Sequence, residues 1–527
     1  MRYARAVSAP TERDRGWQWA AAALLLLLFV YTRAQLLSLP TSDLGRHIVN
    51  GQVVLRQHEV AQTNLFSYTF PQFPFVNHHW LSGVVFALVY EFTGFVGLSL
   101  LQVLVGLCTL LPLLWIARRE AGTPLALLLT MVALPLVASR SEVRPEHASY
   151  LCATAQLLLL WQHRQGRCAP RWLACIPLIQ VLWVNAHVYF FLGFVLVAAF
   201  LIEEAARAGW GPAGARSTHR PRAAALGVTG IAAVVASLLN PAGLRGLVQP
   251  FVILQDYGYQ VVENRPLLTL MRRPEFPFTE SFVLSAALLV AGAGWALRRA
   301  WTRREWPPIA LLLLALFVLA APLFAARNLA LFGYFSIPVG AVLLAPLRGS
   351  LGRALSGARL PLALAGLALA GYAAQPGYWR HQHGLTGLGL RAGALRSLEF
   401  FNGQGLRGPI FNNFDVGGFL IFGLYPKERV FVDNRPEAYP ASFLREVLLP
   451  MQTDEEIWRR EQARTGFNTI VYARDFAPPG AETFLGRRAR DPEWAVVFVD
   501  EFVAILVRRT AQNAPIVERW ELGRTSP

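Results

Sequence analysis

The sequence is poor in charged residues, and this shortage excludes most soluble proteins. Asp, Glu, Lys and Arg make up 16% of its 527 residues, whereas soluble domains carry about a quarter. Hydrophobic residues make up 54%, and the mean hydropathy is +0.37. Because apolar runs fill most of the chain up to residue 375, we expect a bundle of membrane-spanning helices and not a cytosolic enzyme.

Lysine and cysteine are scarce as well. Lys427 is the only lysine, so the formal net charge of +16 comes almost entirely from arginine. The arginines stand mainly in short loops between apolar runs, which indicates membrane topology and excludes a nucleic-acid partner. The four cysteines have no zinc-ligand spacing, and residues 376–527 contain none. The sequence therefore shows neither a disulfide framework nor a zinc motif.

Eleven stretches are apolar enough to be spanning helices, which need about 20 residues each. They lie near residues 17–40, 97–117, 122–139, 148–162, 172–187, 188–206, 223–239, 281–297, 307–325, 329–346 and 360–375. The first has no small-residue cleavage site, so we interpret it as an anchor and not as a signal peptide.

The distribution of arginine predicts the orientation of these spans. With the N-terminus inside, the inner segments hold 20 arginines and the outer segments hold 9. Residues 80–96 are also apolar enough to span, but a span there would turn most of the inner arginines outward. We therefore expect 80–96 to be a helix in the outer interface, anchored by Trp80. The expected location is the cytoplasmic (inner) membrane of a prokaryote, with the N-terminus cytoplasmic.

The composition changes after residue 375. Residues 1–375 are expected to form the transmembrane domain, with a first outer loop at 41–79. Residues 376–527 are polar, and they are long enough for a core of their own. They mix helix-like stretches (Gly389–Phe401, Asp454–Thr465) with strand-like runs (Thr469–Tyr472, Ala495–Val499, Phe502–Val507). The predicted fold is mostly α, a polytopic bundle of about 11 spans with a small extracytoplasmic α/β domain.

Polar residues gather at the outer ends of the predicted spans. Such groups are costly to place in a packed bundle, so their convergence from five outer loops predicts a polar cavity at the outer interface. In chain order they are Asp43, Arg46, His47, His78, His79, Arg140, Glu142, Arg144, Glu146, Asn185, His187, Glu263 and Arg327.

These residue types fit chemistry on a lipid phosphate. A carboxylate can act as general base for an attacking hydroxyl, and the candidates are Asp43, Glu142 and Glu146. Guanidinium groups bind phosphate through paired hydrogen bonds, and the candidates are Arg46, Arg140, Arg144 and Arg327. The remaining cavity residues are His47, His78, His79, Asn185 and His187. Because water outside the cytoplasm holds no nucleotide sugars, an outward-facing transferase needs a donor carried in the membrane.

Short motifs of the sequence resemble those of the GT-C glycosyltransferase superfamily, and in particular of prokaryotic polytopic proteins related to it. The motifs are Ser42-Asp43-Leu-Gly-Arg46-His47, Phe66-Ser67-Tyr-Thr, His78-His-Trp80-Leu81, Arg144-Pro145, Asn185-Ala-His187, Asn240-Pro241, Arg327-Asn328, Phe411-Asn-Asn-Phe-Asp-Val-Gly417-Gly418-Phe-Leu and Val432-Asp433-Asn-Arg435-Pro-Glu-Ala-Tyr439. GT-C enzymes take sugars from polyprenyl-phosphate carriers and use the aspartate after the first span in catalysis.

The resemblance implies a membrane glycosyltransferase in which Asp43 is catalytic. Its partners would be a polyprenyl-phosphate sugar donor, a glycan, lipid or protein acceptor, and membrane lipids. One displacement opposite the leaving phosphate would invert the anomeric centre. Two features depart from the family pattern: His79 stands where an acid is expected, and the acids of the second outer loop are not spaced as a metal-binding pair. No cofactor is therefore certain, and a divalent metal stays open.

Other interpretations of the same residues also stay open. Asp43 fits the N-cap of a helix that begins near Leu44, and Arg46 fits a side chain that reaches lipid headgroups. Glu142, Arg144 and Glu146 are spaced to pair with one another. The adjacent His78 and His79 would point apart on a helix, which favours interfacial packing over metal binding.

Two tail motifs have structural interpretations. Gly417-Gly418 lacks the lysine of a phosphate-binding loop, so we expect a strand kink or close packing there. Asp433-Asn434-Arg435 is expected to start a turn, with acceptor binding as the alternative. For the whole chain, the alternatives are a transporter or flippase of a lipid-linked or anionic substrate, or a non-catalytic component of envelope polysaccharide assembly.

Overall fold

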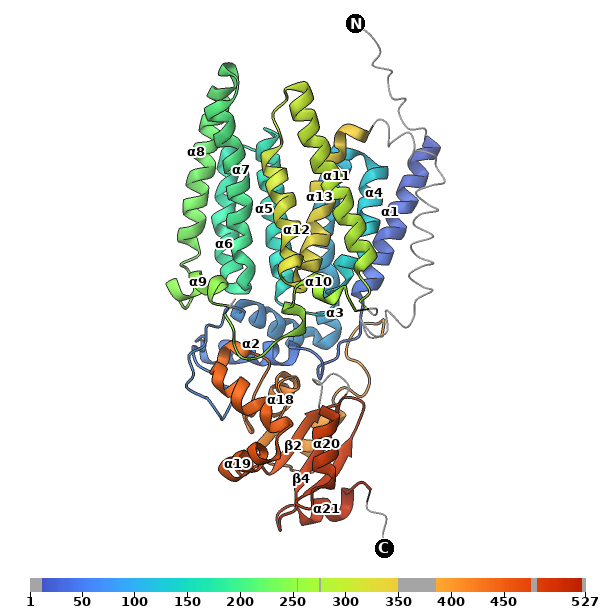
Figure 1. Cartoon of the computed structure of the whole chain (residues 1–527), viewed down its shortest axis with the longest axis vertical. Helices are drawn as coiled ribbons and strands as arrows, with labels where there is room; N and C mark the ends of the chain where they lie inside the picture. The colour runs from blue at the N-terminus through green and yellow to red at the C-terminus, as the bar shows by residue number, and fades with distance from the viewer. Residues whose placement is uncertain (1–11, 254, 274–275, 349–384, 475–480, 524–527) are drawn as a thin grey trace.

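The computed structural model has a helix bundle at one end and a smaller domain with a sheet at the other (Figure 1). It describes residues 12–253, 255–273, 276–348, 385–474 and 481–523. This part of the chain is mostly helical with a small sheet near the C-terminus, as the sequence predicts. The predicted span 360–375 and the predicted domain boundary at 375/376 lie outside the described residues.

Long helices run side by side in the bundle (Figure 1). They are α1 (Glu12–Arg33), α3 (Trp80–Ala121), α4 (Thr123–Ala138), α5 (Glu146–Arg164), α6 (Cys175–Ala186), α7 (Phe191–Trp210), α8 (Ala213–Ala236), α11 (Thr279–Arg303), α12 (Ile309–Phe324) and α13 (Leu329–Leu344). Within the described residues, four helical stretches are long and apolar enough to cross a membrane: Trp80–Ala121, Val188–Trp210, Thr279–Arg303 and Ala326–Leu347. The number of eleven spans stays a prediction.

Helix α1 ends earlier than the sequence predicts. It stops at Arg33, whereas the predicted span continued to residue 40. The next residues are extended: Gln35 pairs with Thr386, and Leu37 pairs with Leu390 at the start of the tail. Apolar composition alone does not distinguish the end of a helix from an extended segment that bonds to a distant part of the chain.

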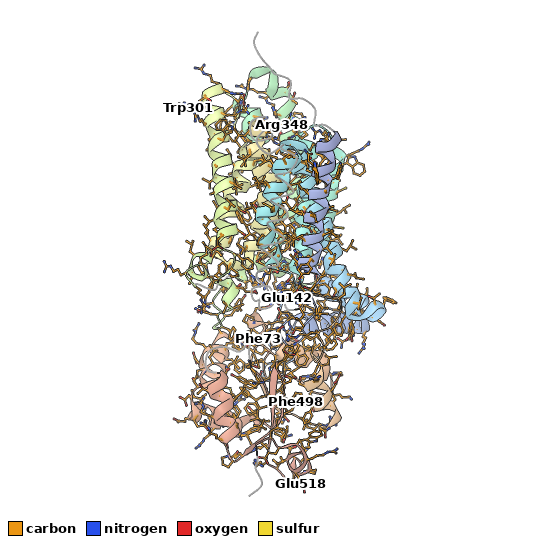
Figure 2. All side chains as sticks on the ribbon, turned by 90° about the vertical axis from the view of Figure 1, so that its right-hand side faces the viewer. Phe73, Glu142, Trp301, Arg348, Phe498 and Glu518 are labelled. Carbon is orange, nitrogen blue, oxygen red and sulfur yellow. The ribbon has the colours of Figure 1, made fainter. Side chains whose placement is uncertain are left out.

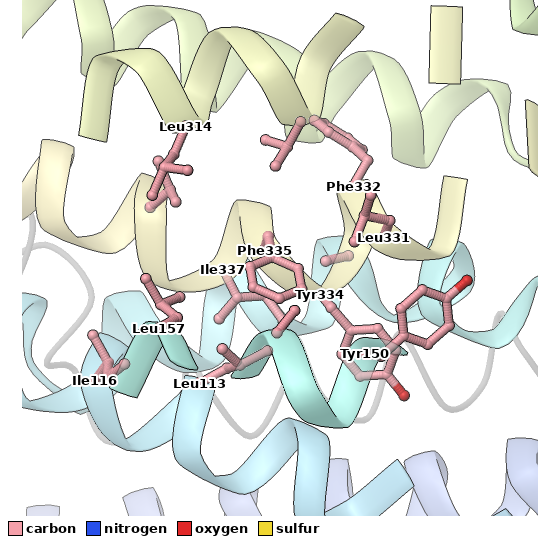
Figure 3. Packing of buried hydrophobic residues seen from close by; sticks show 14 of the residues in the cluster. Leu113, Ile116, Tyr150, Leu157, Leu314, Leu331, Phe332, Tyr334, Phe335 and Ile337 are labelled. Atoms are coloured by element: carbon pink, nitrogen blue, oxygen red, sulfur yellow. The ribbon is translucent and has the colours of Figure 1, made fainter. Parts of the chain in front are cut away.

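Large apolar side chains fill the centre of the bundle. Figure 3 shows Leu113 of α3, Leu157 of α5, Leu314 of α12 and Phe335 of α13 in one packed cluster. Every residue of α13 from Leu329 to Ala341 is buried, as expected for a helix that is apolar on all sides. Helix α13 is therefore central in the bundle.

Helix α3 bends where the predicted interfacial helix meets the predicted span. Gly94 has φ 62° and ψ −156°, which is not helical geometry and is open to glycine. Before the bend, Val85 and Phe92 lie two helical turns apart on one exposed face. An exposed apolar face of this kind suits the membrane interface, so the interfacial placement of 80–96 stays our interpretation.

The first half of α3 packs on α2 (Leu44–Gln57) through two glycines. A Cβ atom on Gly51 would lie 2.0 Å from the carbonyl oxygen of Gly83, which no side chain tolerates. The close approach places both helices across the end of the bundle that faces the tail (Figure 1). Shorter elements at this end are α9 (Leu244–Val252), η3 (Val262–Asn264), α10 (Leu267–Leu270) and η4 (Ala326–Asn328).

The tail contains a sheet with the strand order β1-β2-β4-β3. Its strands are β1 (Ile410–Asn412), β2 (Thr469–Ala473), β3 (Trp494–Val499) and β4 (Val503–Arg508). Strand β1 is parallel to β2, and the other neighbours are antiparallel. The helices are α17 (Arg396–Gly403), α18 (Gly417–Leu424), α19 (Glu455–Thr465), α20 (Ala481–Arg490) and α21 (Ala514–Trp520). The sequence predicts the last three strands but not β1, which is too short to give a pattern.

The tail shares its core with the outer part of the membrane domain. One hydrophobic cluster joins Leu44 and Ile48 of α2, Phe66 of the first outer loop, and Phe419 and Leu420 of α18. The expectation of a separate tail core is therefore only partly met. The shared core fixes the tail directly against the outer loops.

The two ends of the bundle carry different residues. Figure 2 shows Glu142 at the end that faces the tail and both Trp301 and Arg348 at the opposite end. The predicted outer loops and the predicted inner loops thus lie at opposite ends of the bundle. Which end faces the cytoplasm stays a prediction.

Candidate functional site

Asp43 stands immediately before α2, at the junction between the bundle and the tail. Its carboxylate accepts a hydrogen bond from Nδ2 of Asn434 in the tail. Nη2 of Arg46 lies 3.9 Å from the other oxygen, and Nε of Arg46 donates to Oδ1 of Asn434 at 3.0 Å. We call Asp43, Arg46 and Asn434 the Asp43 cluster.

The alternative roles of Asp43 and Arg46 do not match this geometry. In the described chain the Asp43 side chain makes no capping hydrogen bond to α2, although it occupies the N-cap position. Arg46 is buried and bound to Asn434, so it does not extend to lipid headgroups. Both side chains point to partners inside the protein.

Two glycines of α18 allow the tail to reach this position. A Cβ atom on Gly417 would lie 2.3 Å from the carbonyl oxygen of Val432, and one on Gly418 would lie 3.1 Å from Nδ2 of Asn434. Close packing, one of the two predicted alternatives, is correct. The strand kink is wrong, because these glycines form the first turn of a helix.

Three of the predicted phosphate ligands converge on one carboxylate, that of Glu263. Nη1 of Arg140 lies 2.5 Å from it, Nη2 of Arg327 lies 3.0 Å away, and Nη1 of Arg144 lies 3.4 Å away. Burial acts to raise the pKa of Glu263, but the three guanidinium groups outweigh burial and hold this pKa well below its usual range. The sequence showed Glu263 only as a polar residue of the fourth outer loop.

Glu142 and Glu146 belong to the same group of charges. Glu146 lies 3.1 Å from Nε of Arg140, and Glu142 lies 2.6 Å from Nε of Arg144. We call these residues the arginine–glutamate cluster: Arg140, Arg144, Arg327, Glu142, Glu146 and Glu263. Its three positive and three negative charges balance. Of the predicted pairing among Glu142, Arg144 and Glu146, the Glu142–Arg144 pair is present, whereas Glu146 pairs with Arg140. Both candidate bases in that loop already hold a cation.

The two clusters are parts of one site. Burial acts to lower the pKa of Arg144, but the charges of Glu142, Glu263 and Asp43 raise it above its usual value. Burial lowers the pKa of His78 to about 4, and both Arg46 and Arg327 contribute to the decrease. Charges from both clusters thus act on the same groups, and both clusters lie at the end of the bundle that faces the tail.

Four histidines line this site. The ring centroids of His78 and His79 are 3.9 Å apart, and His79 lies 5.3 Å from His47 and 5.2 Å from His187. The expectation that His78 and His79 point apart is wrong, because His79 is the N-cap of α3 and both residues precede the helical turn. Nδ1 of His187 lies 2.8 Å from Oγ of Ser149, which orients that ring.

Burial keeps His47 and His79 neutral near pH 7. Burial lowers the pKa of His47 well below its usual value, and the charges of Arg46 and Arg144 lower it further. Burial also lowers the pKa of His79 well below its usual value. A neutral imidazole has one donor and one acceptor nitrogen, so these rings can bind hydroxyl groups without adding charge.

Asn185 connects the interfacial half of α3 to the bundle. Its Oδ1 accepts a hydrogen bond from Nε1 of Trp80 at 2.8 Å, and its Nδ2 donates to the carbonyl of Leu239 at 2.9 Å. A small pocket lies beside it, with His78 and Asn240 among its lining residues. Asn185, which the sequence predicted as a cavity residue, lines this pocket. Both ends of its amide are already hydrogen-bonded within the protein.

Three tail residues near the Asp43 cluster were not among the predicted site residues, although acceptor binding was the alternative interpretation of the segment that contains Asn434. They are Asn434 and two acids, Asp415 and Glu437. Burial raises the pKa of Asp415 to about 6, and the charge of Asp43 contributes to the increase. Burial also raises the pKa of Glu437. All three lie in motifs that carried the family resemblance, but spacing along the chain did not show that these motifs meet Asp43.

The site does not provide a set of ligands for a metal. Within the described residues, no three His, Cys, Asp or Glu side chains are close enough together to hold a metal ion. Glu146 is bonded to Arg140, Asp415 is bonded to the amide of Asn413, and the rings of His78 and His79 contact each other.

No family model and no curated protein matches the chain, but solved structures share its fold. The archaeal oligosaccharyltransferase AglB from Archaeoglobus fulgidus, in complex with an inhibitory peptide and a dolichol-phosphate, has a TM-score of 0.59 and 14% identity over 88% of this chain and 70% of that chain. The apo oligosaccharyltransferase of Archaeoglobus fulgidus has a TM-score of 0.55 and 13% identity, covering 87% and 69%.

A third structure extends over nearly the whole of both chains. ArnT from Cupriavidus metallidurans, bound to undecaprenyl phosphate, has a TM-score of 0.52 and 13% identity over 94% of this chain and 98% of that chain. The matched proteins are GT-C glycosyltransferases that act with lipid-linked donors. The chain therefore has the fold of GT-C membrane glycosyltransferases, and the resemblance drawn from its motifs is confirmed at this level.

Proposed function

We propose that this protein moves a sugar from a polyprenyl-phosphate-linked donor to an acceptor on the outer face of the cytoplasmic membrane. The observation that carries the proposal is the gathering of carboxylate and guanidinium groups at one end of the bundle: Asp43 lies beside Arg46, and its charge acts on Arg144, which shares Glu263 with Arg140 and Arg327. Two matched structures support it further, since one holds dolichol-phosphate and the other undecaprenyl phosphate.

Arg140, Arg144 and Arg327 bind the donor phosphate in this proposal. Their charges are balanced by carboxylates, so a phosphate that joined them unchanged would leave excess negative charge in a buried site. Glu263 is the carboxylate that all three share. The donor phosphate therefore takes the place of Glu263, and the loop that carries Glu263 moves aside. Arg46 stays with Asp43 and Asn434.

Asp43 acts as the general base. It accepts the proton of an acceptor hydroxyl while that oxygen attacks the anomeric carbon of the sugar. The bond between this carbon and the phosphate oxygen breaks, and the three arginines stabilise the charge of the leaving polyprenyl phosphate. Attack opposite the leaving group inverts the anomeric centre. Nδ1 of His47 and Nε2 of His78, which have no hydrogen-bond partner in the described chain, bind sugar hydroxyls.

The position of the charges argues against a transporter. Secondary transporters bind substrate near the middle of the bilayer, on interrupted helices, whereas both clusters lie at the end of the bundle beside the tail. The convergence of Asp43 with the arginines likewise argues against a purely structural component, which needs no base beside an anion site.

Donor turnover tests the proposed function. The full-length protein in lipid nanodiscs would be incubated with a panel of polyprenyl-phosphate sugars, and the release of polyprenyl phosphate measured with and without a chelator. We expect release from at least one donor. Binding of lipid phosphate without release from any donor, across a broad set of acceptors, would contradict a transferase. Loss of turnover in the chelator arm would contradict a reaction that uses protein groups alone.

Glu263→Gln tests the exchange of carboxylate for phosphate. Removing this charge frees three arginines from their shared anion, so we expect undecaprenyl phosphate to bind more tightly, by roughly 10- to 100-fold, the range of a charged hydrogen bond. Binding would be measured by titration of the nanodisc-embedded protein. Glu305→Gln is the matched control, because Glu305 pairs with Arg299 at an exposed site. Equal or weaker binding in E263Q would show that Glu263 does not compete with phosphate.

A further inference from the structure

Asn434 is the tail residue whose side chain is hydrogen-bonded to both Asp43 and Arg46 among the described contacts. Its amide lies between the two charged members of the Asp43 cluster: Nδ2 donates to Asp43, and Oδ1 accepts from Nε of Arg46 at 3.0 Å. Asp43 and Arg46 themselves are 3.9 Å apart, which is a long and weak contact. The amide therefore contributes more to the orientation of the carboxylate than the direct ion pair does.

We propose that Asn434 is the positioning residue for Asp43, so that the C-terminal domain completes the catalytic centre. This inference rests on the proposed function, because Asp43 is the general base in it. Asn434 does not act on the substrate itself. It holds one carboxylate oxygen, which leaves the other directed toward the acceptor and Arg46.

Only a primary amide fits between these two groups. The position needs a donor toward an anion and an acceptor toward a cation, and an amide offers both without a net charge. An aspartate at 434 would lose the donor and set two carboxylates against each other. An alanine would remove the hydrogen bond to Asp43, so the Asp43 side chain could rotate. The carboxylate would then lose the alignment with the acceptor hydroxyl that catalysis requires.

Asn434 is itself held rigidly. The preceding Asp433 is fully buried, and its carboxylate accepts hydrogen bonds from Nε of Arg435 at 2.7 Å and from the hydroxyl of Tyr439 at 2.9 Å. On its other side Gly418 leaves just enough room for the amide. Because Asn434 is fixed on both sides, its hydrogen bond can hold the Asp43 carboxylate in one orientation.

The first experiment compares the kinetics of Asn434→Ala with those of the wild type. We expect kcat to fall roughly 10- to 100-fold, while KM for the donor stays within about twofold, because the described contacts of Asn434 are to Asp43 and Arg46 and not to the arginines that bind phosphate. Asn402→Ala is the control, since Asn402 is an exposed amide in the same domain. A wild-type kcat in N434A, or a change confined to KM, would overturn the inference.

An exchange of the two side chains separates folding from catalysis. N434D is expected to lower Tm and to abolish turnover through repulsion between the carboxylates. The double variant D43N/N434D restores an amide–carboxylate pair with the groups exchanged, so we expect Tm to recover while turnover stays absent. Failure of the double variant to recover Tm would overturn the contact between residues 43 and 434.

The two readouts distinguish the failure of each proposal. If the wild type releases no carrier phosphate, the proposed function fails, and the melting temperatures still decide whether Asn434 holds Asp43. If the wild type is active and the double variant D43N/N434D is equally active, the position of the carboxylate does not matter, and the positioning role is wrong.

Discussion

Replacing Asp43 with asparagine is expected to lower the rate of sugar transfer by roughly a hundredfold to ten-thousandfold, the usual contribution of a general base. The substitution keeps the size and shape of the side chain. Its carbonyl oxygen still accepts the hydrogen bond from Asn434, so the junction between tail and bundle stays intact. The loss should therefore appear in kcat, measured as release of polyprenyl phosphate, with little change in Tm.

A matched substitution on the surface controls for the lost charge. Asp256 is exposed, and its described bonds are to Arg445 and to the backbone N–H of Gly258, so D256N removes a carboxylate that is bonded to no proposed site residue and should leave turnover unchanged. Wild-type activity in D43N would end the assignment of Asp43 as the base. Activity lost together with protein insertion would instead show that Asp43 has a structural role.

Replacing Arg435 with methionine is expected to cost about 3–5 kcal/mol of stability, because it leaves a buried carboxylate without its partner. Arg435 donates to both oxygens of Asp433 and to Asn64 of the first outer loop. Its guanidinium also lies 4.7 Å from the ring centroid of Phe75. The loss corresponds to a decrease in Tm on the order of 10 °C, measured by thermal melting in detergent or nanodiscs.

Two further variants separate the causes of this effect. Arg445→Met breaks the exposed pair with Asp256 and should change stability by less than about 1 kcal/mol. The double variant D433N/R435M removes both buried charges, so we expect it to recover much of the stability lost in R435M. A Tm of R435M equal to that of the wild type would show that the ion pair does not hold the tail to the outer loop.

The positions of most elements follow from local patterns. The strands β2, β3 and β4 match the strand-like runs, and the bend at Gly94 lies where the expected interfacial helix meets the expected span. Apolar periodicity and arginine-rich loops carry this information within short windows of sequence. The end of α1 and strand β1 were not predicted, because extended pairing with a distant segment decides both.

The sequence named most residues of the candidate site, but it did not show how they pair. The family motif and the outer-loop position singled out Asp43. The preference of guanidinium for phosphate singled out Arg46, Arg140, Arg144 and Arg327, and the last three share a partner in the structure. Their mutual partner Glu263 lies more than a hundred residues after Arg144. The spacing of the arginines along the sequence does not indicate that a carboxylate from another loop binds them.

The sequence by itself determined the arginine-rich and strongly apolar composition, and it predicted the membrane helices, the GT-C resemblance and the polar residues at one end of the bundle, because hydropathy, charge and short motifs are local properties of a chain. Only the tertiary structure decided which polar groups meet. It set Asn434 against Asp43, placed Glu263 among the arginines, and put His78 and His79 in ring contact before the first turn of α3. These contacts depend on packing between segments that are far apart in the chain, such as the close packing of Gly417 and Gly418 of α18 against residues 432–434. Short windows of sequence do not reveal packing of this kind.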